Sequence, residues 1–380
     1  MRFALEGDGN IMAKFVCPYC MDVYDKNNVK YTCPDCGYDG SKPKMFSRTV
    51  KCTNTEVKCN GIAILRQCPS CDHDIPLAVL ETKNLPFSII GVPGSGKTNY
   101  ITVMLHELKK SAGLKLALSH QDKETRDHQS KHYKMIYEDL EPPPANVSGE
   151  ITPQIWSIKN LAKIGKNKVP TYTFTIFDGA GEDHKENIDA NSAVVRYINM
   201  SEAIIFVLDP LTISAIRNEG HIDQKVIQNS LGGGTGEVAF AQDIINDIAN
   251  YIRSMNPGKY RSDSRIKIPV AVVMSKFDTV WSHHSFGQDP LVRNPSLTIE
   301  NGKISVEEIE EVNQEVQDWL REIDEDGLLA TLDANFPNHK FFGVSSYGKP
   351  PKDASTLNKP HPHRVLDPIL WLFKSKKFID

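Results

Sequence analysis

The chain has 380 residues, 40% of them hydrophobic, and a formal net charge of −4. This length predicts two or three domains, and the slightly acidic balance gives no overall attraction to nucleic acid or to an anionic membrane. No apolar run reaches the roughly 18 residues that a membrane-spanning helix needs, and the first residues contain no signal-peptide core. The sequence therefore predicts a soluble, cytoplasmic protein without a membrane span.

All eight cysteines lie between Cys17 and Cys71, which predicts a separate module over residues 1–82. The first four have the spacing C-x₂-C-x₁₂-C-x₂-C of a zinc ribbon, in which each C-x-x-C turn aims two thiolates at one ion. Disulfides are the alternative, but a reducing cytosol favours metal. The first predicted Zn²⁺ site consists of Cys17, Cys20, Cys33 and Cys36. The second, whose spacing is looser, consists of Cys52, Cys59, Cys68 and Cys71.

His73 is an alternative ligand of the second site, although a solvent-facing role is favoured. Four thiolates leave no open position on the ion, so both sites are expected to be structural. Residues 1–86 carry 11 Lys and Arg against 10 Asp and Glu, and each Cys₄–Zn centre adds two negative charges. A nucleic-acid partner is therefore not supported, and a protein-docking or scaffold role for the module is the better interpretation.

The stretch Gly91 to Thr98 matches the phosphate-binding pattern G-x-x-x-x-G-K-[ST] in full. An apolar run precedes it and a helical pattern follows, as a P-loop requires, whereas a plain glycine turn is the alternative. Glycines let backbone N–H groups face phosphate oxygens, and the helix N-terminus favours the same anion. Lys97 would bridge the β- and γ-phosphates, and Thr98 would ligate Mg²⁺. The predicted nucleotide-binding residues here are Gly91, Gly94, Ser95, Gly96, Lys97, Thr98 and Asn99.

A β-patterned run from Thr171 to Phe177 ends in Asp178, followed by Gly181 three residues later. An aspartate at the end of a buried strand, downstream of a P-loop, is placed to hold Mg²⁺, and the Gly181 N–H can contact a γ-phosphate. Between the P-loop helix and these strands, the polar stretch 121–141 predicts a solvated helix.

Near-continuous apolar runs at 203–209 and 268–274 predict central strands of a parallel sheet covered by helices on both faces. The expected fold class is therefore α/β, a mostly parallel sheet flanked by helices over residues 83–380 and preceded by the cysteine module. Further expected elements are helices at 237–255, 307–320 and 365–373 and a last strand at 341–346. Helical insertions into the sheet domain are expected at about 113–150, 211–265 and 281–338.

Five segments in this order resemble the motif set of Ras-like GTPases of the translation-factor class: Gly91 to Thr98, Thr152, Asp178 to Gly181, Ser275 to Asp278 and Val344 to Ser346. The resemblance covers the chain from about Leu85 onward and implies a Ras-like P-loop fold. The cysteine module and the Asp-Gly-Ala-Gly-Glu-Asp run are similar to bacterial double-GTPase families associated with predicted conflict and defence systems.

At the phosphates, the resemblance implies that Thr152 closes on Mg²⁺ and the γ-phosphate, while Asp178 and Gly181 form a second switch. Catalysis would then involve Lys97, Thr152, Gly181 and Glu182. Glu182 stands where the family has a water-orienting glutamine, so hydrolysis is expected to be slow or differently organised. Lys97 and Thr152 are separated by 54 residues, so the Thr152 assignment requires a real insertion.

At the base, the resemblance implies that Lys276 lies along the ring and that Asp278 accepts hydrogen bonds from the guanine ring N–H and amino group. The N–H of Ser346, beside Ser345, would meet the guanine carbonyl. Adenine lacks that donor pair, which penalises ATP. Ser275 stands where the pattern has asparagine, and its shorter side chain weakens the expected guanine specificity.

The sequence thus predicts a GTP-binding switch that hydrolyses GTP to GDP, regulatory in a bacterial conflict or defence system, with Mg²⁺ and one or two Zn²⁺ ions. A protein partner or effector, or another copy of the chain, is expected to act with it. Two alternatives stay open. One is an ATP-dependent P-loop protein, and the other is a zinc-organised interaction protein in which the nucleotide is only structural.

Overall fold

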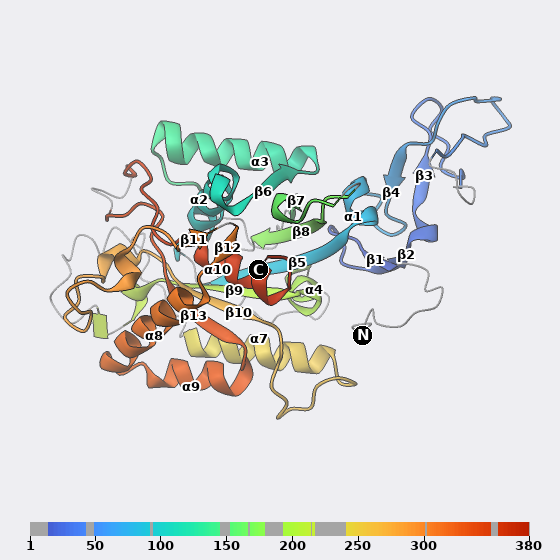
Figure 1. The fold of residues 1–380 in the computed structure, drawn as a ribbon. Coiled ribbons are helices and arrows are strands. Elements are labelled where there is room, and N and C mark those ends of the chain that lie inside the picture. The colour runs from blue at the N-terminus through green and yellow to red at the C-terminus, as the bar shows by residue number, and fades with distance from the viewer. Residues whose placement is uncertain are drawn as a thin grey trace.

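A computed structural model describes residues 14–42, 49–91, 94–144, 153–165, 168–178, 193–213, 215–216, 241–300, 302–350 and 356–379. Within them the main element is a sheet of seven strands, five of them parallel, shown in Figure 1. In sheet order the strands are β13 (His339–Gly343), β10 (Val270–Met274), β9 (Ala203–Leu208), β5 (Lys83–Gly91), β8 (Thr171–Asp178), β7 (Pro153–Asn160) and β6 (Leu116–His120).

The parallel strands end at the same edge of the sheet. Ile89 of β5 pairs with Asp178 of β8, and Gly91 pairs with Val207 of β9. The two antiparallel pairings are those of β7, with β8 on one side and with β6 on the other. This is the Ras-like P-loop fold that the sequence predicts, with β6 as an added edge strand. The segments that follow the parallel strands are therefore close together at the carboxyl edge of the sheet. Open α/β sheets bind their ligands at this edge.

Helices cover both faces of the sheet, because its central strands are apolar on both sides. Along β9, one set of alternating side chains packs with α7 and α9 and the other set packs with α2 and α10. The predicted central strands and their flanking helices are confirmed. The helices are α1 (Leu77–Glu81), α2 (Lys97–Lys110), α3 (Lys123–Tyr133), α4 (Ala193–Met200), α7 (Ala241–Met255), α8 (Val306–Glu322), α9 (Asp326–Asn335) and α10 (Asp367–Ser375).

The insertion after the P-loop helix contains β6 and α3, and a π-helical turn (Lys134–Asp139) extends α3. A solvated helix was expected here, and most side chains of α3 are exposed, although one side of the helix is buried. Thr125 and His132 are buried, and the Thr125 hydroxyl accepts a hydrogen bond from Ile155 N of β7 at 2.8 Å. Composition does not reveal this buried side, because a buried polar group such as the Thr125 hydroxyl can be satisfied by a hydrogen bond.

The cysteine-rich segment forms two small antiparallel pairs, β1 (Lys14–Val16) with β2 (Val23–Asp25) and β3 (Lys30–Thr32) with β4 (Leu65–Gln67). In Figure 1 the β3–β4 pair extends away from the sheet, whereas β1 and β2 lie beside it. One further pair, β11 (Ile299–Glu300) with β12 (Lys303–Ile304), lies before α8. Among the described residues, no helix is long and apolar enough to cross a membrane.

Candidate nucleotide site and cysteine clusters

The P-loop connects β5 to α2, and its glycines are required by the backbone. A Cβ on Gly91 would lie inside van der Waals distance of the Val207 carbonyl oxygen, and Gly94 and Gly96 have φ values of +73° and +80°. Lys97 begins α2 and is buried, with its Nζ donating to the Gly91 carbonyl at 2.9 Å. An ammonium beside a backbone nest is the arrangement that binds polyphosphate.

Two further observations show that these residues fit a bound nucleotide. Ser95 Oγ is buried and has no hydrogen-bond partner in the described part of the chain. Such an orphaned hydroxyl calls for an explanation, and a phosphate oxygen would satisfy it. Asn99 lies in the first turn of α2, with its Oδ1 also buried and without a partner among the described residues.

Thr98 and Asp178 form the candidate magnesium pair. Thr98 lies in the first turn of α2 and Asp178 is the last residue of β8. The Thr98 hydroxyl donates a hydrogen bond to Asp178 Oδ2 at 2.9 Å. A hydroxyl and a carboxylate are hard oxygen ligands of the kind that Mg²⁺ takes together with substrate phosphates. The chemistry of the pair therefore fits Mg²⁺ beside the P-loop, as the sequence predicts.

Ser275 follows β10 and touches the P-loop directly. Its hydroxyl lies 2.7 Å from the Ser95 carbonyl and 3.1 Å from the Leu208 carbonyl, within donating distance of both. Serine at this position is short, but it still ties the end of β10 to the phosphate loop. The expectation that it weakens guanine specificity stays a prediction.

Lys276 follows Ser275 and has a φ of +48°. Its side chain lies against the P-loop. Its Nζ donates to the Gly94 carbonyl at 2.8 Å and pairs with Asp209 Oδ2 at 2.6 Å. The Asp209 carboxylate is buried at the end of β9. Sequence reasoning missed Asp209, although it follows a buried strand just as Asp178 ends one, and the same rule would have found it.

Asp278 and Ser345 meet at the other end of the site. Burial raises the pKa of Asp278, while a hydrogen bond with the Ser345 side chain and the nearby His363 and Lys276 act in the opposite direction. Ser345 is buried just after β13, and Ser346 beside it is half-buried. The structure thus brings the predicted base-binding residues to the same edge as the P-loop. Thr152, Gly181 and Glu182 lie outside the described residues.

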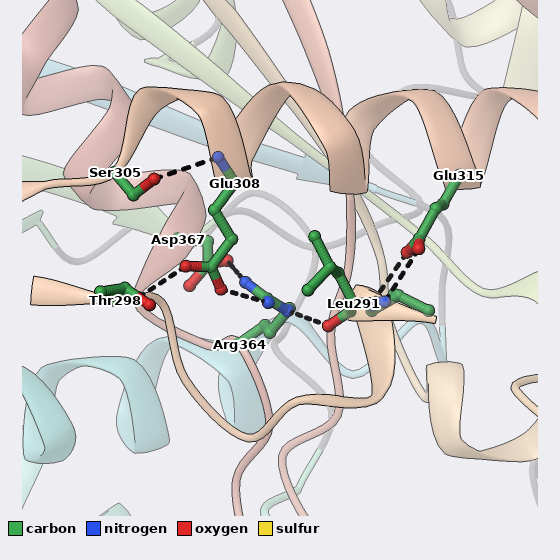
Figure 2. Close-up of polar contacts among 8 residues, drawn as sticks. Leu291, Thr298, Ser305, Glu308, Glu315, Arg364 and Asp367 are labelled. Carbon is green, nitrogen blue, oxygen red and sulfur yellow. Dashed lines mark hydrogen bonds and ion pairs between the residues drawn. The ribbon is translucent and has the colours of Figure 1, made fainter. Parts of the chain in front are cut away.

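A buried arginine, which sequence reasoning missed, lies behind this base end. Its neighbour His363 exchanges backbone hydrogen bonds with Ser345 at 3.1 and 2.8 Å. The guanidinium of Arg364 donates to Glu308 Oε1 at 2.6 Å, Asp367 Oδ2 at 2.7 Å and the Leu291 carbonyl at 2.9 Å (Figure 2). It therefore joins α8, α10 and the loop before α8, next to the segment that carries Ser345.

Glu308 is also part of the N-terminal turn of α8. Its amide donates to the Ser305 hydroxyl at 3.1 Å, which caps the helix, and its Oε2 accepts from Thr298 N at 2.9 Å (Figure 2). Burial acts to raise the pKa of Glu308, but the bonds from Arg364 and Thr298 outweigh it and leave that pKa below its ordinary value. The carboxylate is therefore held ionised beside the arginine.

The cysteines form two groups of four, but the predicted grouping was wrong. A proximal cluster contains Cys17, Cys20, Cys68 and Cys71, and a distal cluster contains Cys33, Cys36, Cys52 and Cys59. The antiparallel pairing of β3 with β4 explains this, because Thr32 pairs with Leu65 and Lys30 pairs with Gln67. Cys33, directly after β3, and Cys68, directly after β4, are thereby held at opposite ends of the ladder.

Both clusters fit a tetrahedral metal ion. Adjacent Sγ atoms lie 3.8 Å apart for Cys17 and Cys71 and 3.7 Å apart for Cys20 and Cys68. In the distal cluster, the distances are 3.8 and 3.6 Å. A Zn–S bond of about 2.3 Å places tetrahedral sulfurs about 3.8 Å apart, whereas a disulfide needs about 2.05 Å. The four thiolates would hold Zn²⁺ as a closed structural site.

Metal stoichiometry of paired variants distinguishes the interleaved grouping from the sequential one. We expect the unaltered chain to hold two zinc ions, one for each cluster. Cys20→Ser with Cys68→Ser alters only the proximal cluster and should remove one zinc, whereas Cys20→Ser with Cys36→Ser should remove both. Elemental analysis after gel filtration measures this. The reverse pattern, with the second pair losing only one ion, would show that the cysteines group in chain order.

No family model matches the chain. A Mycolicibacterium smegmatis protein, SaeC, whose curated name provisionally assigns it to ESX-1 scaffolding and assembly, is 21% identical over 94% of this chain and 97% of its own length. Among solved structures, the Arl6 (BBS3) small GTPase of Trypanosoma brucei bound to GppNp is 14% identical, covering 78% of this chain and 98% of that one, with a TM-score of 0.30. The Ski7 GTPase-like domain of S. cerevisiae, bound to GDP and phosphate, is 13% identical, covering 70% and 43%, with a TM-score of 0.26.

Proposed function

We propose that this chain is a GTP-binding switch that hydrolyses GTP slowly until a protein partner engages it. One observation carries the proposal. Lys97, the Thr98–Asp178 pair and the Asp278–Ser345 pair converge at one edge of the sheet, tied to one another through Ser275 and Lys276. This convergence supports the proposal, because a single bound nucleoside triphosphate requires phosphate, magnesium and base contacts side by side.

In this proposal the P-loop residues hold the phosphates. The N–H groups of the loop and the N-terminus of α2 attract the β- and γ-phosphates, and Lys97 exchanges its Gly91 carbonyl partner for phosphate oxygens. Thr98 and Asp178 hold Mg²⁺, which supplies charge neutralisation at the phosphates when bound. Because these groups are fixed in advance, charge that develops during hydrolysis is stabilised without reorganisation of the site.

The proposed hydrolytic residues Thr152, Gly181 and Glu182 come from the family resemblance. Thr152 and Glu182 would orient the attacking water, and Gly181 would donate its N–H to the γ-phosphate. Glutamate in place of glutamine supports slow intrinsic turnover, because a carboxylate accepts from water but does not donate to the phosphate. Phosphate release over many turnovers, with and without candidate partners, measures this step.

Nucleotide titration tests the proposal. The purified chain should bind GDP and GTP in Mg²⁺ and show no comparable affinity for ADP or ATP, because adenine cannot donate two hydrogen bonds to Asp278. Equal or stronger adenine binding would instead support the ATP-dependent alternative. Tight guanine binding without any phosphate release, alone or with partners, would support a structural nucleotide.

Lys97→Met should weaken GTP binding by about 10- to 100-fold, since one charge-assisted hydrogen bond contributes about 1.5–3 kcal/mol. The matched control is Lys110→Met at the other end of α2, where the lysine is exposed and contacts Glu107. Fluorescence titration with a labelled GTP analogue measures both. Similar affinities for the two variants would place the phosphates away from Lys97.

A role in assembling proteins is consistent with the SaeC likeness, which extends over most of both chains. We propose that the nucleotide state controls a protein partner, with the cysteine-rich segment as the docking region. A regulatory role in bacterial conflict systems stays a prediction that rests on the family resemblance. Capture of a defined partner by the GTP-bound but not the GDP-bound protein would test the switch.

A further inference from the structure

Three C-x-x-C turns have the same backbone conformation, but the residue that follows the second cysteine is unusual in one of them. In each turn, the residue after the second cysteine donates its amide to the carbonyl of the first cysteine and has a positive φ. These residues are Met21, Gly37 and Asp72, with φ values of 61°, 71° and 57°. Glycine takes this conformation freely and aspartate tolerates it, but for most other residues it costs about 1–2 kcal/mol. Methionine is therefore the unexpected residue.

The side chain of Met21 packs directly against the nucleotide domain. Met21 is 4% exposed and shares a buried cluster with Phe177 of β8 and Tyr197 of α4. The rings of Phe177 and Tyr197 stack with centroids 3.7 Å apart. Phe177 immediately precedes Asp178, the candidate Mg²⁺ ligand. Met21, a strained residue directly after Cys20 of the proximal cluster, thus supports the strand end that carries this carboxylate.

Hydrogen bonds also connect the turn that contains Cys17 and Cys20 to the nucleotide domain. The Tyr197 hydroxyl donates to the Tyr19 carbonyl at 2.9 Å, and the Tyr19 hydroxyl donates to Asp122 Oδ2 at 3.2 Å. Asp122 caps α3 by accepting from Thr125 N at 2.6 Å. Cys17 and Cys68 also share an apolar cluster with Ile155 of β7. The proximal cluster is therefore packed against the nucleotide domain.

In the described part of the chain, the distal cluster has no such contacts with the nucleotide domain. Its apolar neighbours, within the described residues, all belong to the cysteine-rich segment and are Tyr31, Val50 and Ala63. The two clusters share the same chemistry but differ in what they touch. Variants of the two clusters can therefore be compared. An effect of the proximal site on nucleotide binding should appear only in the proximal variants, whereas a general effect of metal on folding should appear in both.

We propose that the metal ion of the proximal cluster positions Asp178 through Met21, so that Mg²⁺-dependent nucleotide binding requires the proximal site. The inference rests on the proposed nucleotide function. Two of the four metal–sulfur bonds would come from Cys17 and Cys20 of this turn, and they would hold Met21 at its unfavourable positive φ. Loss of the ion releases the turn and removes Met21 from Phe177, which leaves the Asp178 carboxylate less well placed. Met21 is a positioning residue and does not touch the nucleotide.

The decisive variant is Met21→Gly, which suits the left-handed backbone better than methionine and removes only the side-chain contact. Asp72→Gly is its matched control, because it makes the same change in the other turn of the same cluster, where the side chain is exposed and paired with Lys30. Both variants should keep two zinc ions. Met21→Gly should lower GDP affinity in Mg²⁺ by about tenfold, the lower end of the effect of losing support for a metal ligand.

Titrations with Mg²⁺ and in Mg²⁺-free buffer that contains no chelator, so that the zinc ions stay bound, distinguish positioning from general damage. The loss in Met21→Gly should occur with Mg²⁺ and be nearly absent without it, whereas Asp72→Gly should match the unaltered chain in both. Equal affinities of the two variants in Mg²⁺ would overturn the proposal. So would a loss of the same size with and without Mg²⁺.

Hydrogen exchange tests the coupling without any nucleotide. Cys20→Ser should speed amide exchange in β8, whereas Cys36→Ser, the corresponding change in the distal cluster, should leave β8 protected. If the unaltered chain binds no nucleotide, the proposed function is refuted, and exchange alone decides whether the proximal metal supports the end of β8. Equal protection of β8 in the two variants would refute the coupling even where nucleotide binding is established.

Discussion

Asp278→Asn should weaken GDP binding by about 100-fold or more, because two hydrogen bonds to a carboxylate are lost, at about 1.5–3 kcal/mol for each charged pair. The amide that replaces the carboxylate also offers a donor to the guanine amino group, where an acceptor is needed. Xanthine carries a carbonyl at that position, so the variant should gain affinity for XDP. Titration with GDP, XDP and ADP measures all three.

Asp289→Asn is the control for this change, since Asp289 is an exposed residue of the loop that follows the site. It should bind GDP as the unaltered chain does. An Asp278→Asn variant that keeps full GDP affinity, or one whose ADP affinity matches its GDP affinity from the start, would refute the base assignment.

The same carboxylate predicts a pH dependence. Burial raises the pKa of Asp278, so its carboxyl becomes protonated at a higher pH than an ordinary aspartate. The protonated form loses acceptor capacity, so GDP affinity should fall as the pH is lowered through that pKa. In Asp278→Asn this fall should be absent. A fall of equal size in both proteins would assign it to another group.

The sheet could be predicted because its information is local. The apolar run at β9 is buried on both faces, and the P-loop pattern fixes a strand, a turn and a helix in one stretch of chain. Asp178 was predicted from its place at the end of a buried strand, whereas Ser275 and Asp278 were predicted from the family resemblance. All three lie at one edge of the sheet, because the ends of parallel strands do. Asp209 obeys the same rule and was missed only because no family motif marks it.

The cysteine grouping could not be predicted from spacing, because it depends on which segments far apart in the sequence pair with each other. Cys17 and Cys20 share the proximal cluster with residues about fifty positions later, and the pairing of β3 with β4 decides which turns meet. Arg364 was missed for the same physical reason. Its partners Glu308 and Leu291 lie 56 and 73 residues away, and nothing in the adjacent sequence indicates that they converge.

Arg364→Met should lower the free energy of unfolding by about 3–5 kcal/mol, the usual result of removing one partner of a buried ion pair. The side chains of Arg364 and Asp367 are fully buried, and the side chain of Glu308 is mostly buried. Methionine fills much of the space but leaves these carboxylates without their cation. Arg321→Met, which removes an exposed arginine paired with Asp318 on the same α8, should change stability by less than about 1 kcal/mol. Urea denaturation measures both.

The dependence on pH identifies the cause of this loss. In the unaltered chain, burial raises the pKa of Asp367 to about 6, although Arg364 acts in the opposite direction. Arg364→Met removes that opposing charge, so the folded-state pKa of Asp367 rises further and the carboxyl keeps a proton that the unfolded chain has released. Raising the pH then favours the unfolded chain, and the deficit relative to the unaltered protein should grow as the pH rises above about 6. Adding Asp367→Asn should recover part of the stability at high pH. A deficit that is constant with pH and unaffected by Asp367→Asn would instead reflect lost packing around the arginine stem.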